Sequence, residues 1–330
     1  MSALFGDGSK ADTTVLVVDV ENGSVASALV RLSNLENPRL FAEHRIALPV
    51  TQSVSSTAIF KDIQKALDQS LGETAKVAAR IRQHQKLSSQ GVINGAHLFF
   101  GPPWTSSSWG AGGLEWDFEP SVVKHVRRSA ESVVGDAPIQ HHSNSWAAAH
   151  AASSLAAGRL LVCIMTGEVV ELLVVEDGRI EGRATVPLGL HTLLRTLTTH
   201  AALSTQEARS ALRLYQPTSG ESFVFDEPLQ AAASHFVEQF AAVAQTLLAS
   251  SPVSTIVVVA PEPIGAWFAR ALAESSIAAQ FFPDGGTTRD IRTKHLMPYV
   301  QTLGTNTDLP LMLEALFTHA LRRSEYGIKY

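Results

Sequence analysis

The sequence predicts an α/β protein with two domains, each built on a mixed β-sheet flanked by helices. Strand patterns and helix patterns alternate along all 330 residues, as in layered α/β folds. One hairpin pattern occurs twice, once near the N-terminus and once in the middle of the chain. With 45% hydrophobic and 17% charged residues, the composition is globular, and the chain is long enough for two substantial cores.

The repeated hairpin is clearest in residues 160–180, where two apolar runs flank a tight turn at Thr166, Gly167 and Glu168. Placing Gly23 over Gly167 without gaps aligns VLVVDVENGSVASALV with RLLVCIMTGEVVELLV. Each copy ends in a similar third strand, HRIALP or GRATVP. The duplication predicts two like-ordered, three-stranded meanders that face each other across a cleft.

The other elements of the first half follow from periodicity and turn residues. Apolar spacing predicts helices at residues 58–81 and 120–134, and a continuous apolar run predicts a buried strand at 92–100. Residues 136–145 are expected to form a loop, followed by an Ala-rich helix at 146–157. His141 and His142 are expected to be loop histidines, because no cysteine or nearby carboxylate completes a metal site.

The second half continues with helices after its meander. Residues 190–200, 204–215, 227–250, 264–274 and 310–323 are predicted helices, and residues 256–259 a buried strand. Ser204 and Glu207 form a predicted capping box, and Asp308 is the predicted cap of the last helix. Residues 281–283 are a candidate for one more short strand.

Residues 101–118 contain Trp104, Trp109 and Trp116 in a Gly/Ser-rich segment that is expected to be a loop. The simplest interpretation is that these rings fold back onto the body of the protein. A second is a protein-interaction patch, because tryptophan is enriched at interface hot spots. A membrane-interface role is the third, although basic residues do not accompany the rings.

Composition also limits the partners and the location. The net charge of −5, without a large basic cluster, argues against a nucleic-acid partner. No apolar run approaches the roughly 20 residues that span a bilayer. The single cysteine, Cys163, fits a reducing cytoplasm. We expect a flexible tail at residues 1–14, a first domain at 15–157 and a second domain at 158–330.

The duplicated hairpin resembles the phosphate loops of the actin-like ATPase superfamily, which has a duplicated, ribonuclease H-like fold. Asp19, at the end of a strand before a turn with Gly23 and Ser24, resembles the first phosphate loop. The second hairpin stands where that superfamily has its second phosphate loop, and residues 254–274 resemble its adenosine segment. The nearest branch is similar to the cell-division and type IV pilus assembly proteins FtsA and PilM. FtsA-like proteins have a small inserted subdomain in the middle region of the chain, so the resemblance implies that the first domain here has a reduced insertion around residues 101–140.

The motifs that carry this resemblance are degenerate. Glu21 and Met165 stand where the family has glycines, and the ungapped alignment puts Cys163 opposite Asp19, where the family has a second acid. Ala260 and Pro261 replace the family's glycine pair, and proline removes a donor. If nucleotide binding is retained, the resemblance assigns it to these residues: Asp19, Glu21, Asn22, Gly23, Ser24, Thr166, Gly167, Glu168, Glu171, Ala260 and Pro261.

Three functions are compatible with this pattern. The favoured one is a non-catalytic scaffold, similar to PilM or FtsA, that assembles a membrane-associated pilus or division machine. It would need no cofactor or metal, and its partner would be a protein anchored in the membrane, with self-association also open. It would lie in the cytoplasm, at the inner face of the membrane through that partner. The alternatives are an active Mg²⁺-dependent ATPase using Asp19, Ser24 and Glu171, and a small-molecule kinase.

Overall fold

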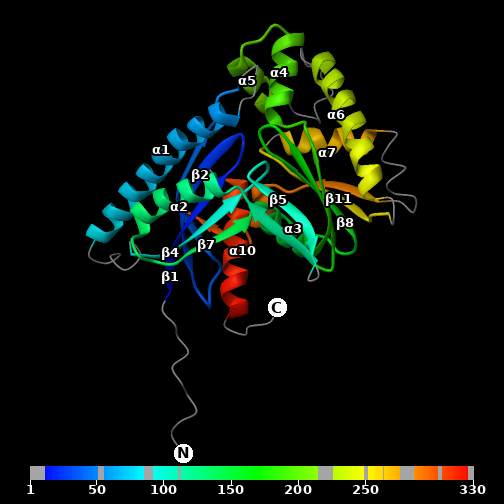
Figure 1. Cartoon of the computed structure of the whole chain (residues 1–330). Coiled ribbons are helices and arrows are strands. Elements are labelled where there is room, and N and C mark those ends of the chain that lie inside the picture. The colour runs from blue at the N-terminus through cyan, green and yellow to red at the C-terminus, as the bar shows by residue number, and fades with distance from the viewer. Residues whose placement is uncertain are drawn as a thin grey trace, which may run out of the picture.

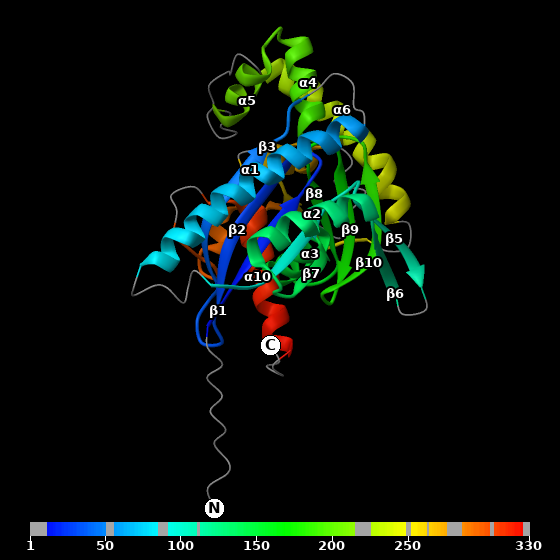
Figure 2. The ribbon, with the colours of Figure 1, turned by 60° about the vertical axis from the view of Figure 1, so that its left-hand side comes forward.

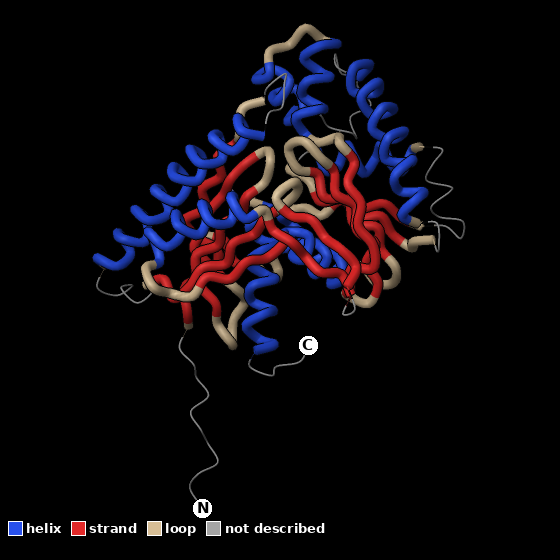
Figure 3. The backbone as a smooth tube through the Cα atoms, in the orientation of Figure 1, coloured by secondary structure: helices blue, strands red, loops and turns tan. Residues whose placement is uncertain are grey.

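The computed structural model describes residues 12–50, 56–84, 92–110, 113–214, 226–248, 252–262, 264–275, 286–303 and 307–325. Most of the described chain forms two mixed β-sheets with helices between and around them (Figure 1, Figure 3). Residues 1–11 and the candidate strand at 281–283 lie outside the described residues. Thr13 and Thr14, assigned to the flexible tail by the sequence, begin the first strand.

The first sheet has six strands in the order β13-β3-β2-β1-β4-β7. Strands β1, β2 and β3 form an antiparallel meander, and β4 and β7 continue the sheet in parallel with β1. Their bounds are β1 Thr13–Val20, β2 Ser24–Leu32, β3 Arg39–Ala47, β4 Ile93–Phe100, β7 Ile139–Ser143 and β13 Gln301–Thr302.

The second sheet has five strands in the order β10-β9-β8-β11-β12. Strands β8, β9 and β10 form the second antiparallel meander, and β11 and β12 run parallel to β8. Apart from β13, the two sheets therefore share one strand order, and the predicted pair of like-ordered meanders is confirmed. The bounds are β8 Leu160–Met165, β9 Val170–Glu176, β10 Arg179–Val186, β11 Thr255–Val259 and β12 Thr287–Asp290.

Two helices, α3 (Asn144–Leu155) and α10 (Leu309–Glu325), lie between the sheets (Figure 1). One buried cluster joins them to the inner faces of both sheets, for example through Val17 of β1 and Val162 of β8. The small side chains of α3, which include several buried alanines, allow this close packing. The two sheets thus share one central core.

The outer faces are covered by separate groups of helices (Figure 2). Helices α1 (Ser56–Gln83) and α2 (Pro120–Val134) pack on the first sheet through residues such as Ile63 and Val126. Four helices cover the second sheet and extend above it. They are α4 Leu190–His200, α5 Thr205–Leu214, α6 Asp226–Leu247 and α7 Ile264–Glu274.

The structure corrects three sequence-based expectations. The Gly/Ser-rich segment is a hairpin, β5 (Thr105–Gly110) paired with β6 (Gly113–Phe118). In β6 the aromatic Trp116 and Phe118 alternate with acidic residues, a pattern that suits a two-faced ribbon. His141 and His142 lie in β7 rather than in a loop. Finally, β13 and α10 pack on the first sheet although they follow the second sheet in the chain.

No helix among the described residues is long and apolar enough to cross a membrane.

Candidate functional site

The tips of the two repeated hairpins touch each other. A Cβ atom added to Gly23 would lie 2.5 Å from the Cα of Gly167, so these positions require glycine. The side chain of Asn22 fastens the contact, since its Oδ1 accepts a 2.9 Å hydrogen bond from the Glu168 amide and its Nδ2 donates to the carbonyl of Pro102. The loops that the resemblance places around phosphates are therefore in backbone contact.

Backbone amides at both tips are already bonded within the protein. The amide of Glu21 donates to the carbonyl of Ser24, and that of Thr166 donates to the carbonyl of Val169. These equivalent bonds show that Glu21 matches Thr166, one residue away from the ungapped alignment. The strand pairs agree, because Val20 faces Val25 and Met165 faces Val170 across loops of equal length.

This register corrects the assignment of Cys163 as the counterpart of Asp19. Ile164 occupies the equivalent position, and its side chain lies in the central core between the sheets. Cys163 points to the opposite face of β8, toward α6 and α7, because successive strand residues alternate between faces. Burial raises the pKa of the Cys163 thiol, which is therefore neutral at physiological pH.

The N-terminus of α4 holds the second hairpin tip. The amide of Leu190 donates to the carbonyl of Thr166 at 2.9 Å, and that of His191 donates to the carbonyl of Gly167. Glu168 turns back to contact His191 at 3.0 Å and Arg195 at 2.6 Å. Burial alone would raise the pKa of Glu168, but the hydrogen bonds from His191 and Arg195 lower it to about 2.

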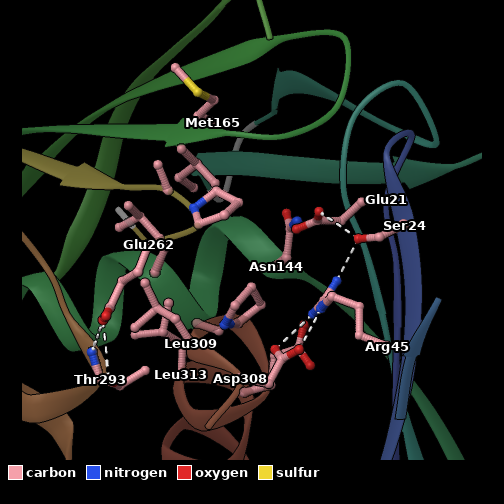
Figure 4. Close-up of a pocket in the computed structure, with 18 of the residues that line it drawn as sticks. Glu21, Ser24, Arg45, Asn144, Met165, Glu262, Thr293, Asp308, Leu309 and Leu313 are labelled. Carbon is pink, nitrogen blue, oxygen red and sulfur yellow. Dashed lines mark hydrogen bonds and ion pairs between the residues drawn. The ribbon is translucent and has the colours of Figure 1, made fainter. Parts of the chain in front are cut away.

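Arg45, on β3, stands at the centre of the first half of the site (Figure 4). Its guanidinium donates to both carboxylate oxygens of Asp308, at 2.5 and 2.9 Å, and to Asp19 at 2.7 Å. It also donates to the hydroxyl of Ser24 at 2.6 Å. Asp308 in turn accepts the Leu311 amide, so the predicted cap of the last helix is confirmed. One arginine thus joins β1, β2, β3 and α10.

The cluster around Arg45 contains more carboxyl groups than basic groups. Burial and the charge of Asp19 raise the pKa of Glu21 to about 8. Burial also raises the pKa of Asp19, despite the nearby Arg45, and that of Glu314, which faces Asp19. At the edge of the cluster, burial raises the pKa of Glu43 to about 7. The cluster therefore holds protons near neutral pH.

Glu171 belongs to a separate arrangement. It is wholly buried and pairs with Arg183 of β10, and it accepts a 2.8 Å hydrogen bond from Ser145 at the start of α3. The Arg183 guanidinium lies 4.6 Å from the ring centre of Trp116 and donates to Thr105 in β5. Glu171 therefore helps to hold the β5–β6 hairpin on the second sheet. In the described part of the chain, the side chain of Ser24 has Glu21 and Arg45 as its hydrogen-bond partners instead.

The segment that resembles an adenosine site follows β11. Ala260 is buried, whereas Pro261 and Glu262 are exposed. One oxygen of Glu262 accepts hydrogen bonds from the amide and the hydroxyl of Thr293, at 2.7 and 3.1 Å. Both residues lie on the wall of the cleft (Figure 4). Glu262 thus acts locally as a cap for the short helix α9 (Thr293–Leu296).

Two cavities of about 230 and about 350 Å³ lie beside the hairpin tips. Both are lined by Glu21, Ser24, Arg45, Met165 and Pro261. The smaller cavity extends toward α3 and α10, and the larger toward His191 and Arg209. Seven of the predicted binding residues line at least one cavity: Glu21, Gly23, Ser24, Thr166, Gly167, Ala260 and Pro261.

The tryptophans whose side chains are described do not form an exposed patch. Trp104 is buried in the core of the first sheet, at 7% exposure. Trp116 is half-buried against Trp146 and under Arg183. The side chain of Trp109 lies outside the described residues. For Trp104 and Trp116, the interpretation that the rings fold back onto the body is the better one.

No group of three or more His, Cys, Asp or Glu residues in the described part of the chain is arranged to hold a metal ion. His142 stacks on His97, with 3.0 Å between the facing ring nitrogens. Burial lowers the pKa of His97 to about 4 and that of His142 to about 3, so both rings are neutral at pH 7.

Sequence reasoning missed Arg45 and Glu314 and gave Asp308 only a capping role. One signal for Arg45 was present: both copies of the third strand, HRIALP and GRATVP, carry an arginine as their second residue. Each of these arginines, Arg45 and Arg183, pairs with a buried acid on the inner face of its own sheet. No local pattern marks Glu314, which lies in the middle of an apolar helix.

Comparison with solved structures shows an actin-like fold. EutJ, an ethanolamine utilization protein from Carboxydothermus hydrogenoformans, aligns with a TM-score of 0.54 at 15% identity, over 94% of this chain and 92% of that chain. A PilM–PilN type IV pilus biogenesis complex gives 0.53 at 10% identity, over 96% and 99%. A ROK family glucokinase from Streptomyces griseus, bound to glucose and AMPPNP, gives 0.51 at 13% identity, over 94% and 100%.

The sequence matches no model of a known protein family and no curated protein. At these low identities the structural likeness establishes the fold alone. The chain therefore has the two-domain actin-like ATPase fold, shared by proteins with different functions.

Proposed function

We propose that this chain is a non-catalytic actin-like scaffold, comparable in role to PilM or FtsA, which assembles with protein partners in a membrane-associated machine. The observation that carries the proposal is the set of bonds from Arg45 to Asp19, Ser24 and Asp308. The resemblance makes Asp19 the acid on the metal side of an ATPase site. Here a guanidinium neutralises that acid and leaves it committed to an internal ion pair.

The chain's own residues do not fit a bound Mg²⁺-nucleotide. A phosphate loop needs backbone amides directed at the ligand, whereas those of Glu21, Thr166 and Glu168 are bonded internally. The contact between Gly23 and Gly167 fills the space between the loops. On the second strand, Ile164 supplies no metal ligand where a second acid would be needed. These features together support a site without nucleotide chemistry.

The scaffold part of the proposal rests on the fold. The PilM neighbour was solved as a complex with PilN, so this architecture supports assembly with a protein partner in that case. Ion pairs of Arg45 link the first sheet to α10, and Arg183 links the β5–β6 hairpin to the second sheet. Such internal bracing suits a binding platform. We propose a membrane-anchored protein as the partner, which would bring this chain to the inner face of the membrane.

A nucleotide titration tests the non-catalytic part. Purified full-length chain is titrated calorimetrically with ATP, ADP and AMPPNP, with and without Mg²⁺, and phosphate release is followed in parallel. We expect no saturable binding below millimolar nucleotide and no turnover above the buffer blank. Magnesium-dependent turnover that Asp19→Ala abolishes would establish the ATPase alternative. Phosphate transfer to a sugar, as the glucokinase neighbour suggests, would establish the kinase alternative.

A separate experiment tests the scaffold part. The tagged chain, expressed at its native level, is cross-linked in cells, and the captured protein is then tagged for the reciprocal capture. We expect one membrane protein to be recovered in both directions, and the chain to leave the membrane fraction when that protein is deleted. A chain that remains soluble and uncross-linked would contradict the scaffold role.

A further inference from the structure

The smaller cavity contains buried polar side chains that the described part of the chain leaves without partners. Glu314 of α10 is 1% exposed, and neither of its carboxylate oxygens accepts a hydrogen bond there. Asn144, at the start of α3, is 7% exposed, and both atoms of its amide group are unpartnered as well. Both residues line the cavity. Buried polar groups normally have partners, so this pair indicates a missing ligand.

The charged residues around the cavity indicate whether the ligand is positively or negatively charged. Glu21, Asp308 and Glu314 line it, and Arg45 is the one basic residue among its described lining residues. Arg45 is already bonded to Asp19, Asp308 and Ser24. Burial raises the pKa of Glu314, so it holds a proton in the ligand-free cavity, and an entering cation would displace that proton and pair with the carboxylate. With Arg45 committed elsewhere, the cavity therefore favours a positively charged ligand.

The other residues that line the cavity indicate the size and polarity of the rest of the ligand. Met165 lies on one side of the cavity, and Leu309 and Leu313 lie on the side of α10 (Figure 4). Ile164 and Val259 add further apolar surface from the second sheet. The volume, about 230 Å³, is below the roughly 300 Å³ at which drug-sized pockets begin. The ligand is thus small, with a charged head and a short apolar body.

An organic cation fits these residues better than a metal ion, because the described residues offer no group of three metal-ligating side chains. An ammonium head has three N–H donors, which match the oxygens of Glu314, Glu21 and Asn144. We propose that this cavity binds a primary ammonium ion carrying a short alkyl chain. This ligand site is additional to the scaffold role. Its test does not depend on the outcome of the nucleotide titration.

Calorimetry and thermal unfolding of the unmodified, full-length chain provide the first test. The probe is n-butylamine at pH 7.5, against n-butanol as the neutral analogue and KCl at equal ionic strength. We expect a Kd between about 10 µM and 1 mM, the range open to a ligand of so few atoms, and a rise in Tm with the amine alone. An equal response to n-butanol or to K⁺ would overturn the proposal.

A change in the ligand tests the head group without altering the protein. Butyltrimethylammonium keeps the charge and the chain but lacks the N–H donors, and we expect it to bind at least about tenfold more weakly. Affinity equal to that of n-butylamine would overturn the assignment of the oxygens. The same head group ends a lysine side chain, so N-acetyl-lysine methylamide is titrated alongside. Tighter binding of N-acetyl-lysine methylamide would identify a lysine side chain of a protein as the ligand. Tighter binding of n-butylamine would identify a small-molecule amine.

A matched pair of variants tests the residue. Glu314→Gln should weaken n-butylamine binding about 10- to 100-fold, because it removes the charge that accepts from the ammonium group. The ligand-free variant should unfold at nearly the same temperature as the unmodified chain at pH 7.5, since the raised pKa of Glu314 already keeps that side chain neutral there. Glu181→Gln, at an exposed position on β10, should change neither quantity. Unchanged affinity in Glu314→Gln would overturn the site, and the ligand series decides the matter if that variant does not fold.

Discussion

Single side chains account for much of the stability near the cleft. Arg45 is the main example, because Asp19 is wholly buried and depends on it for a positive charge. Replacing Arg45 by methionine keeps most of the apolar stem but leaves this carboxylate unpaired. We expect a loss of about 3–5 kcal/mol in the free energy of unfolding, measured by urea denaturation at pH 8.

The control for this change is Arg127→Met on α2. Arg127 and Glu131 form an exposed pair at 3.0 Å, with side chains 52% and 45% exposed. Such a pair contributes about 0.3–0.5 kcal/mol. Similar small losses in both variants would contradict the central role of Arg45.

The raised pKa of Glu21 predicts a pH dependence of stability. Its folded-state pKa of about 8 lies above the ordinary value of 4.5, so between these values the folded chain holds a proton that the unfolded chain has lost. Stability therefore falls as pH rises from about 4.5 to about 8, by about 1.4 kcal/mol per unit of pKa shift at most. Asp19, Arg45 and Asp308 are the charged groups that act on Glu21.

Glu21→Gln removes this contribution. We expect its Tm to fall less than that of the unmodified chain between pH 6 and pH 8.5, and its Tm at pH 8.5 to be the higher of the two. Differential scanning calorimetry across this range measures both. Parallel pH profiles for the two proteins would show that Glu21 ionises normally.

Among the elements, the repeated hairpins depend on their glycines. A Cβ atom on Gly167 would lie 2.3 Å from the Cα of Gly23, which is closer than real contacts permit. Gly167→Ala must therefore separate the two tips and break the hydrogen bond from Glu168 to Asn22. We expect a loss of about 1–3 kcal/mol by chemical denaturation.

Gly72→Ala is the matched control. Gly72 lies within α1, and a Cβ atom there would meet nothing within 4 Å. Alanine in a helix interior is favoured over glycine by about 1 kcal/mol, so this variant should gain stability. A gain in both variants would mean that the hairpin tips are not in contact in solution.

For the molecule as a whole, the β5–β6 hairpin connects the first half of the chain to the second sheet. Trp116 packs on Trp146 of α3 and beneath Arg183 of β10. Trp116→Ala should lower stability by about 1–3 kcal/mol and speed amide exchange in β5, β6 and β10, with α1 unchanged. Tyr299→Ala, at an exposed aromatic, should leave the exchange pattern as it is. Uniform acceleration would argue against a local connection.

Local patterns in the sequence were enough to determine the elements and their repeated order. Apolar runs separated by turns predict the two meanders, and the structure has both, in sheets of the same strand order. The capping box of Ser204 and Glu207 is present, with hydrogen bonds in both directions. These features depend on neighbours within a few residues, so the sequence alone could predict them. Gly23 and Gly167 were recognised as turn residues of the repeat, but their mutual contact was not predicted.

Only the tertiary structure determined the register between the two hairpin copies and the long-range partners of the charged side chains. An ungapped alignment pairs Asp19 with Cys163, but a shift of one residue reverses the face of a strand, and Ile164 is the true counterpart. Arg45 and Asp308 are separated by 263 positions in the chain, and no local signal pairs them. The return of α10 to the first sheet brings Glu314 beside Asp19. These contacts arise because packing two sheets around shared helices brings distant residues together, which sequence periodicity does not encode.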